Sequence, residues 1–221
     1  MQSLTSERPK PMLEVGGKPM LEHVLDRLRE AGVIEALLVT GYHGGLIESH
    51  FAAYPMRCVF ERQEPVNGTG RAALLARDFA GGSPFLLTFG DILAPASEYA
   101  GMIARFAADP AADAVIAVKH VPDPYQGAAV YESGGVLTRI VEKPGIGTSA
   151  TNWNSAGIFI FRPSIFDELA RLKLSPRGEY ELTGAIAALV ESGRRVLSYE
   201  LTGPWRDVGR PEDLAAARTE A

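Results

Sequence analysis

Short apolar runs alternate with amphipathic helical segments along the first half of this chain, and this alternation strongly constrains the fold. A helix is predicted over residues 19–31, where Met20, Val24 and Leu28 form an apolar stripe and Gly32 suits the helix end. Strands that alternate with helices predict an α/β fold with a mixed, mostly parallel sheet and helices on both faces. Further strands are predicted over 36–40, 57–61, 85–89 and 114–118, and further helices over 44–53, 69–79 and 97–108.

The second half of the chain is richer in strands. Ser133-Gly134-Gly135 separates two strand-like runs, residues 127–131 and 136–142, which predicts a hairpin. Two further strands are predicted over 156–161 and 195–201, and helices over 164–172, 179–192 and 211–218.

Length and charge narrow the class of protein. A chain of 221 residues can bury a core without disulfides or a structural metal, and we expect one domain, 1–221. The net charge of −5 lacks the basic footprint of a nucleic-acid-binding protein. No apolar run approaches the ~20 residues of a membrane span, and the polar N-terminus is not a secretory signal. We therefore expect a cytoplasmic protein with neither a membrane nor a nucleic-acid partner.

The usual nucleophiles and metal-binding clusters are missing from the pattern. The histidines His23, His43, His50 and His120 do not have the spacing of metal ligands. The single cysteine, Cys58, excludes an internal disulfide and lies in a strand-like run, which favours a packing role over a nucleophilic one.

Two aspartates occupy positions suited to a divalent cation. Asp91 follows a predicted strand, at the edge where α/β sheets bind ligands, and Asp207 lies within Trp205–Gly209. Two carboxylates distant in sequence could meet on one Mg²⁺, which prefers oxygen ligands and substrate phosphates. Asp91 alone fits an ordinary turn or helix cap equally well.

A glycine-containing segment follows the strand predicted to end at Glu61. Gln63 carries an amide that can donate and accept at the edge of a pyrimidine base, and Gly68 lets the backbone approach a ligand at a helix start. The same residues also fit an Asn-Gly turn followed by a Thr69 cap.

Other candidate contacts are lysines and a polar strand entry. Lys10, between two prolines, and Lys143, after another strand, could each bind a phosphate, although both also fit solvated surface lysines. Asn154 and Gly157 could bind sugar hydroxyls or form a strand-entry turn.

The order of these segments is far more specific than any one of them. It closely resembles the sugar-1-phosphate nucleotidyltransferases, from about Leu4 to Ala217. The segments that carry the resemblance are Glu7–Leu13, Gly17–Leu21, Gln63 with Asn67–Gly70, Gly90-Asp91, Glu142-Lys143-Pro144, Asn154–Gly157 and Trp205–Gly209.

The resemblance implies a GT-A/Rossmann-like three-layer α/β/α fold, with a nucleotide-binding part over about 1–118 and a sugar-binding part over about 119–221. It implies transfer of a nucleotidyl group from a nucleoside triphosphate to a hexose-1-phosphate, with release of pyrophosphate. The sub-pattern around Gln63 favours UTP or dTTP, and guanylyl members remain open. A homo-oligomer is compatible with the resemblance.

The resemblance also implies roles for individual residues. Asp91 and Asp207 would bind Mg²⁺, Lys10 the nucleotide phosphates and Lys143 the sugar phosphate. The remaining assignments are Gln63, Gly68 and Thr69 to the nucleotide, and Gly127, Glu142, Asn154 and Gly157 to the sugar.

One family feature has no counterpart in the sequence as given. The family's first strand and glycine-rich loop ending in Gly-Thr-Arg, roughly 15 residues, would precede Leu4. A start site placed too late, a truncation or a real loss would each explain this. We expect the 221 residues to turn over poorly unless the segment is restored. A nucleotide-sugar-binding relative without turnover and a GT-A glycosyltransferase are the alternative functions.

Overall fold

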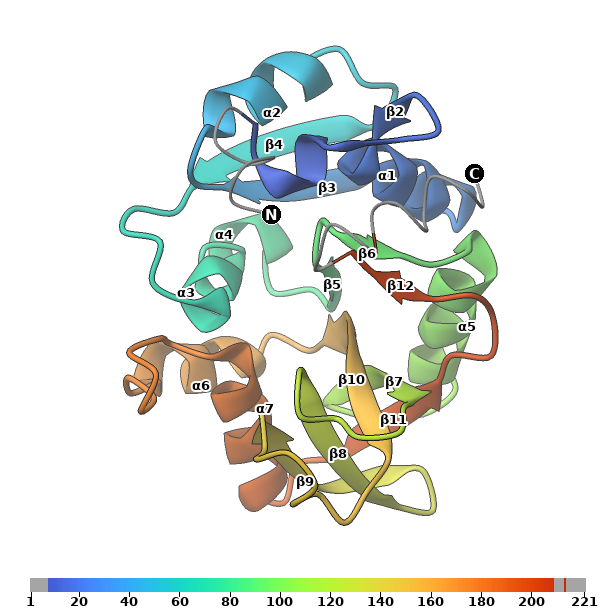
Figure 1. Cartoon of the computed structure of the whole chain (residues 1–221), viewed down its shortest axis with the longest axis vertical. Helices are drawn as coiled ribbons and strands as arrows, with labels where there is room; N and C mark the ends of the chain where they lie inside the picture. The colour runs from blue at the N-terminus through green and yellow to red at the C-terminus, as the bar shows by residue number, and fades with distance from the viewer. Residues whose placement is uncertain (1–7, 209–212, 214–221) are drawn as a thin grey trace. The chain divides into compact units, whose positions relative to one another are not determined.

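Each of the two units of this chain combines segments that are distant in sequence (Figure 1). The computed structural model describes residues 8–208 and 213, so the helix predicted over 211–218 lies, apart from residue 213, outside the described part. The first unit contains residues up to Val66, Phe89–Ala100 and the segment from Gly203 onward. The second unit contains Asn67–Thr88 and Gly101–Thr202. The predicted division of ligand binding near residue 118 stays a prediction.

Two parallel strands form the sheet of the first unit. They are β3 (Glu35–Thr40) and β4 (Arg57–Arg62), paired along their full length. The intervening helix α2 (Gly44–Phe51) packs on β4, as a crossover between parallel strands requires. Helix α1 (Met20–Glu30) buries the apolar stripe that the sequence predicts, so these four elements confirm the predicted order.

Short elements complete the first unit and carry several candidate site residues. A 3-10 turn η1 (Lys10–Met12) precedes the hairpin of β1 (Glu14–Val15) and β2 (Lys18–Pro19). Strand β6 (Ile92–Leu93) pairs antiparallel with β12 (Arg206–Asp207). A small core of Leu13, Val15, Met20 and Val208, with Leu93 packed against it, joins these pieces.

A six-stranded sheet is the centre of the second unit, in the order β5-β10-β7-β11-β9-β8. Most residues of its central strands are fully buried. The predicted Ser-Gly-Gly hairpin is confirmed between β8 and β9. The strands are β5 (Phe85–Thr88), β7 (Ala114–His120), β8 (Ala128–Ser133), β9 (Val136–Glu142), β10 (Trp153–Phe161) and β11 (Val196–Glu200).

The α/β class is confirmed, but the expectation of a mostly parallel sheet is wrong for this sheet. Within the described chain, β7 and β11 form its single parallel pair. β10 runs antiparallel to both β5 and β7, and the β8–β9 hairpin adds further antiparallel pairs. The β8–β9 pair is antiparallel because a tight hairpin reverses the chain, whereas a parallel pair needs a crossover connection.

One helix of the second unit packs on β9 and is contacted by two other helices. Helix α7 (Leu182–Glu191) contacts β9, α6 (Ile165–Arg171) and α3 (Thr69–Leu74).

The prediction of a single helix over 69–79 is wrong, because α4 (Arg77–Ala80) is separate from α3. The N–H groups of Leu75 and Ala76 bond three residues back instead of four, which ends the α-helical ladder there. Helix α5 (Ala96–Ala107) begins in the first unit and ends in the second.

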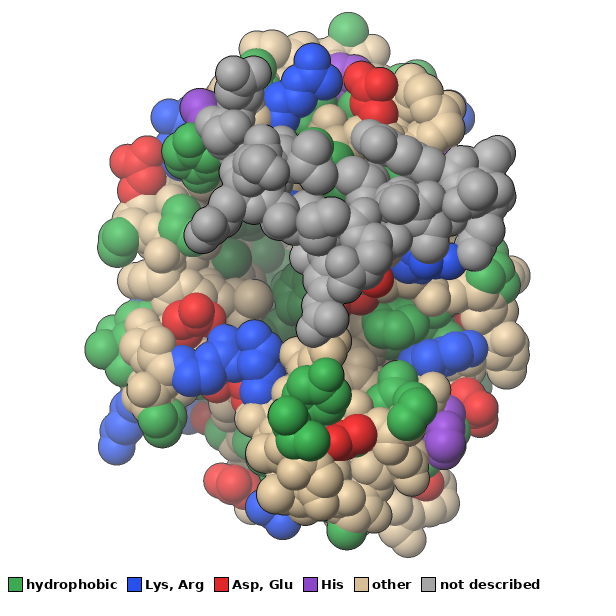
Figure 2. All heavy atoms as spheres, viewed as in Figure 1, with side chains coloured by type: hydrophobic (Ala, Val, Ile, Leu, Met, Phe, Trp, Pro, Cys, Tyr) green, Lys and Arg blue, Asp and Glu red, His purple; other side chains and the backbone are tan. Residues whose placement is uncertain are grey.

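On the face drawn in Figure 2, basic and acidic side chains are interspersed and do not form one large basic patch. This distribution agrees with the net charge of −5. Within residues 8–208 and 213, none of the helices combines the length and the apolar character needed to cross a membrane.

A carboxylate on α1 makes the stability of the first unit depend on pH. Asp26 accepts hydrogen bonds from Lys18 and Tyr54. Burial alone would raise the pKa of Asp26, but these bonds and the nearby positive charges hold that pKa below its ordinary value. A depressed carboxyl pKa adds stability above the unfolded-state value, and this stability is lost as the pH falls through the folded-state value.

We therefore expect Asp26→Asn to lower the free energy of unfolding by about 1–2 kcal/mol at pH 7, the size of a charged hydrogen bond. The difference from the wild-type chain should shrink below about pH 4. Urea unfolding at both pH values measures it, with exposed Asp78→Asn as the control. An equal loss at both pH values would contradict the role of the charge.

Candidate functional site

The first group of predicted site residues lies in the first unit and is centred on Asp91. Lys10, the first residue of η1, donates a hydrogen bond from its ammonium to the Asp91 carboxylate across 81 positions of sequence. Both side chains are about three-quarters buried, with 27% and 23% of their surface exposed. Pro9 and Pro11 flank Lys10 and restrict its backbone, so the lysine is held against this carboxylate.

Asp207 is brought next to Asp91 by strand pairing. Asp207 on β12 lies opposite Ile92 on β6, and the N–H of Val208 donates to the carbonyl oxygen of Asp91 at 3.1 Å. Of the two predicted metal ligands, Asp207 therefore lies on β12, and Asp91 immediately precedes the paired strand β6 of this short β-ribbon.

The donor set of this ribbon suits a hard cation only in part. Carboxylate oxygens are the ligands that Mg²⁺ prefers, and Asp91 and Asp207 each carry a carboxylate. Within residues 8–208 and 213, no three His, Cys, Asp or Glu side chains gather as a metal centre. A Mg²⁺ ion at Asp91 and Asp207 would thus take its remaining ligands from water and substrate phosphates, as this ion commonly does.

Gln63 also belongs to the first unit. It follows β4, where its N–H donates to the Thr40 carbonyl at 2.8 Å and extends the β3–β4 pairing by one residue. Its side chain is half-buried at the carboxyl end of this parallel pair, the edge at which the sequence predicts a base contact.

Gly68 and Thr69 lie in the second unit, where they pack against the segment that leads into α7. Gly68 has φ +127°, and a Cβ there would lie 2.4 Å from the Tyr180 carbonyl oxygen. The hydroxyl of Thr69 accepts a hydrogen bond from the N–H of Leu182 at 3.0 Å. The backbone at Gly68 therefore lies close to the backbone of Tyr180 in the same protein.

Three candidate sugar-binding residues and Lys143 lie together at the ends of β8, β9 and β10. The N–H of Lys143 donates to the Gly127 carbonyl at 2.7 Å, with Lys143 in the left-handed region at φ 39°. A Cβ on Gly127 would lie only 2.3 Å from Asn154 Oδ1. Gly127 therefore touches both Lys143 and Asn154, and Ala128 is paired with Glu142 across the hairpin.

Asn154 carries the most informative polar atom of this group. The side chain is 9% exposed, and its Nδ2 donates to the Ser155 carbonyl at 2.8 Å. Its Oδ1 is buried and accepts no hydrogen bond from the described residues. A buried acceptor without a donor costs free energy, so a hydroxyl-bearing ligand at this position would stabilise the site.

Gly157 has a structural reason for being glycine. It has φ 76° and lies where the pairing of β10 with β7 shifts between Ser155 and Phe159. Such a bulge in the left-handed region favours glycine. The structure thus places Gly157 in the irregular part of β10, three residues beyond Asn154.

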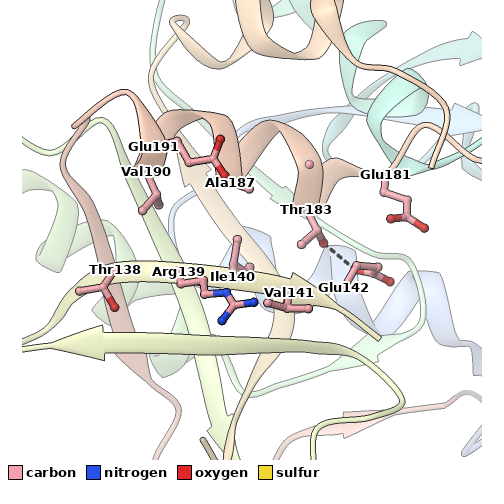
Figure 3. A pocket seen from close by; sticks show the side chains of 11 residues that line it. Thr138, Arg139, Ile140, Val141, Glu142, Glu181, Thr183, Ala187, Val190 and Glu191 are labelled. Carbon is pink, nitrogen blue, oxygen red and sulfur yellow. Dashed lines mark hydrogen bonds between the residues drawn. The ribbon is translucent and has the colours of Figure 1, made fainter. Parts of the chain in front are cut away.

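Glu142 is held by two residues that the sequence analysis missed. Its Oε2 accepts a hydrogen bond from the Thr183 hydroxyl at 2.6 Å (Figure 3). Arg177 approaches Oε1 at 3.4 Å. A groove of about 380 Å³ runs between β9 and α7 beside them, where Gly184 and Ala187 leave space. No local signal marks Thr183, because its contact depends on the packing of α7 against β9.

Comparisons with known proteins show which family this chain is similar to. The nucleotidyl transferase family profile matches residues 1–221. The chain is 31% identical to the low-salt glycan biosynthesis nucleotidyltransferase Agl11 of Haloferax volcanii, over 98% of this chain and 61% of that protein. It is 33% identical to the bifunctional protein GlmU of Methanocaldococcus jannaschii, over 98% of this chain and 50% of that protein. The chain therefore spans half to three-fifths of the length of these two relatives.

In two further comparisons the matched region covers most of both chains. The UTP--glucose-1-phosphate uridylyltransferase AglF of Haloferax volcanii is 32% identical over 96% of this chain and 88% of that protein. A crystal structure of UDP-glucose pyrophosphorylase with UDP-glucose superposes with a TM-score of 0.88 at 22% identity, over 98% of this chain and 91% of that one. The match over all 221 residues and the likeness to AglF show that this chain belongs to the nucleotidyl transferase family.

Proposed function

We propose that this chain transfers a nucleotidyl group from a nucleoside triphosphate, UTP or dTTP by preference, to a hexose-1-phosphate. The observation that carries the proposal is the buried Asn154 Oδ1, an acceptor that lacks a donor beside Gly127 and near Glu142 and Lys143. A sugar hydroxyl supplies the missing donor, and Lys143 supplies a positive charge for the phosphate. Family membership and the activity for which AglF is named support the same reaction class.

In the proposed reaction, an oxygen of the sugar phosphate forms a bond to the α-phosphorus of the triphosphate. The bond from the α-phosphorus to the oxygen that bridges it to the β-phosphate breaks, and pyrophosphate leaves with that oxygen. The protein forms no covalent intermediate in this scheme, so its contribution is to position the substrates and to neutralise charge. The proposal includes the GT-A/Rossmann-like three-layer fold that the family resemblance implies.

The residues take complementary parts in this proposal. Asp91 and Asp207 would hold Mg²⁺, which neutralises phosphate charge when bound. Lys10 would exchange its hydrogen bond with Asp91 for one with a nucleotide phosphate. Gln63, Gly68 and Thr69 would contact the nucleotide, with Gln63 and Gly68 at its base. Gly127, Glu142, Asn154 and Gly157 would bind the sugar.

The test is a pyrophosphate-release assay with five nucleoside triphosphates and a panel of hexose-1-phosphates, run on the 221 residues and on a chain that also carries the family's N-terminal strand and glycine-rich loop. For the longer chain we expect release that needs both substrates and is fastest with UTP or dTTP. Absence of release with every pair, alongside binding of a nucleotide sugar, would favour a binding protein without turnover. Hydrolysis or transfer of a nucleotide sugar without pyrophosphate would favour a glycosyltransferase.

Gly127→Ala tests the sugar side of the proposal. Its Cβ would overlap Asn154 Oδ1, so the asparagine must move away from its present position. We expect KM for the hexose-1-phosphate to rise about tenfold, the equivalent of one lost hydrogen bond, while KM for the triphosphate changes little. Gly45→Ala, at a glycine with no atom within 4 Å of an added Cβ and an ordinary backbone conformation, is the control. Equal KM values for sugar phosphate in wild type and Gly127→Ala would contradict the assignment.

A further inference from the structure

The carboxylate of Glu142 is held by contacts of unequal strength. Thr183 donates to Oε2 at 2.6 Å, a distance typical of a strong, charge-assisted bond between a hydroxyl and a carboxylate. Arg177 contacts Oε1 at 3.4 Å, near the long limit of a hydrogen bond. The Arg177 side chain is 37% exposed and is shared with Glu179 and Glu181, both also at 3.4 Å. Exposed, shared pairs of this kind contribute little, so the orientation of Glu142 depends mainly on Thr183.

Thr183 is itself held in place by the first turn of α7. The preceding residue, Leu182, is 2% exposed, and its N–H bonds to the Thr69 hydroxyl at 3.0 Å. A β-branched residue in a helix has few side-chain conformations available. The Thr183 hydroxyl therefore approaches Glu142 from a fixed point, and Figure 3 shows the two side chains directed toward each other across the end of the groove.

We propose that Thr183 is a positioning residue that fixes the Glu142 carboxylate for a sugar hydroxyl. The inference rests on the proposed function, because it gives Glu142 a sugar to bind. With Oε2 occupied by Thr183, the remaining acceptor positions of the carboxylate are limited in direction, so a hydroxyl must approach from a defined side. Thr183 thus acts on sugar binding through Glu142 and touches no reacting atom.

The test compares Thr183→Val, which keeps the shape and removes the hydroxyl, with Thr183→Ser, which keeps the hydroxyl. We expect Thr183→Val to raise KM for the hexose-1-phosphate about tenfold, with kcat and KM for the triphosphate within about twofold. Thr183→Ser should restore the sugar KM to within about twofold of wild type. Thr138→Val, on β9 in the same groove, is the matched control, because Thr138 lies outside the proposed site.

A second measurement separates this inference from the proposed function. In protein carrying ¹³C at glutamate side-chain carboxyls, Thr183→Val should shift the Glu142 resonance and Thr183→Ser should return it. If the wild type releases no pyrophosphate with any pair, the proposed function fails, and the resonance alone tests the positioning. An unmoved resonance, an unchanged sugar KM in an active enzyme, or Thr183→Ser behaving like Thr183→Val would each overturn the role of the hydroxyl. Thermal unfolding of each variant verifies that it is folded.

Discussion

Asp91→Asn is expected to lower the rate of pyrophosphate release by about 10²–10³-fold, the range found when one electrostatic contact to a transition state is removed. The amide keeps the size of the side chain but removes the negative charge that Lys10 now contacts. It also removes one of the two carboxylates proposed to hold Mg²⁺, on a ribbon that offers few other donors. The substitution therefore weakens the binding of Mg²⁺ and also the contact that holds Lys10, the lysine proposed to bind the triphosphate.

The measurement is single-turnover pyrophosphate release at saturating substrates, repeated over a range of Mg²⁺ concentrations. The loss should be partly recovered at high Mg²⁺, because weaker binding is offset by mass action. Asp207→Asn should behave in the same direction, and Asp78→Asn, an exposed acid on α4, should match wild type. A rate for Asp91→Asn within about threefold of wild type would remove Asp91 from the site.

The sequence predicts the fold well wherever the signal is local. The apolar stripe of α1 is buried as predicted, and the Ser-Gly-Gly turn joins β8 to β9 as predicted. Strand direction is a different kind of property, since it depends on which strands become neighbours. Strand β10 illustrates this, because its own composition indicates a buried strand but does not show that it runs antiparallel to both β5 and β7.

The sequence predicts candidate residues of the site, but not all of the residues that contact them. Family resemblance selects Lys10 and Asp91, and the structure places them in contact although 81 positions separate them. The partners of Glu142 were missed, because Thr183 reaches it only after α7 packs on β9. Residue type and order thus identify candidate groups, whereas packing decides which protein atoms already occupy their donors and acceptors.

Gly68 shows how a predicted ligand contact can also have a structural cause. Its φ of +127° is a region that residues with a Cβ rarely adopt, and an added Cβ would lie 2.4 Å from the oxygen and 2.6 Å from the nitrogen of Tyr180. Both of these are backbone atoms that rotation of a side chain cannot move away. The same stretch of backbone is fixed by hydrogen bonds from Tyr180 to Asn67 at 2.9 Å and from Gly70 to Tyr180 at 2.7 Å.

We therefore expect Gly68→Ala to lower the free energy of unfolding by about 3–5 kcal/mol. Strained backbone accounts for about 1–3 kcal/mol, and each weakened hydrogen bond for about 1 kcal/mol. Urea unfolding measures the change. Gly82→Ala is the matched control, since Gly82 has φ +81° but no atom within 4 Å of an added Cβ, and it should lose only about 1–2 kcal/mol. Equal losses in the two variants would mean that the approach to Tyr180 adds nothing, and Gly68 would then owe its identity to backbone conformation or to the nucleotide.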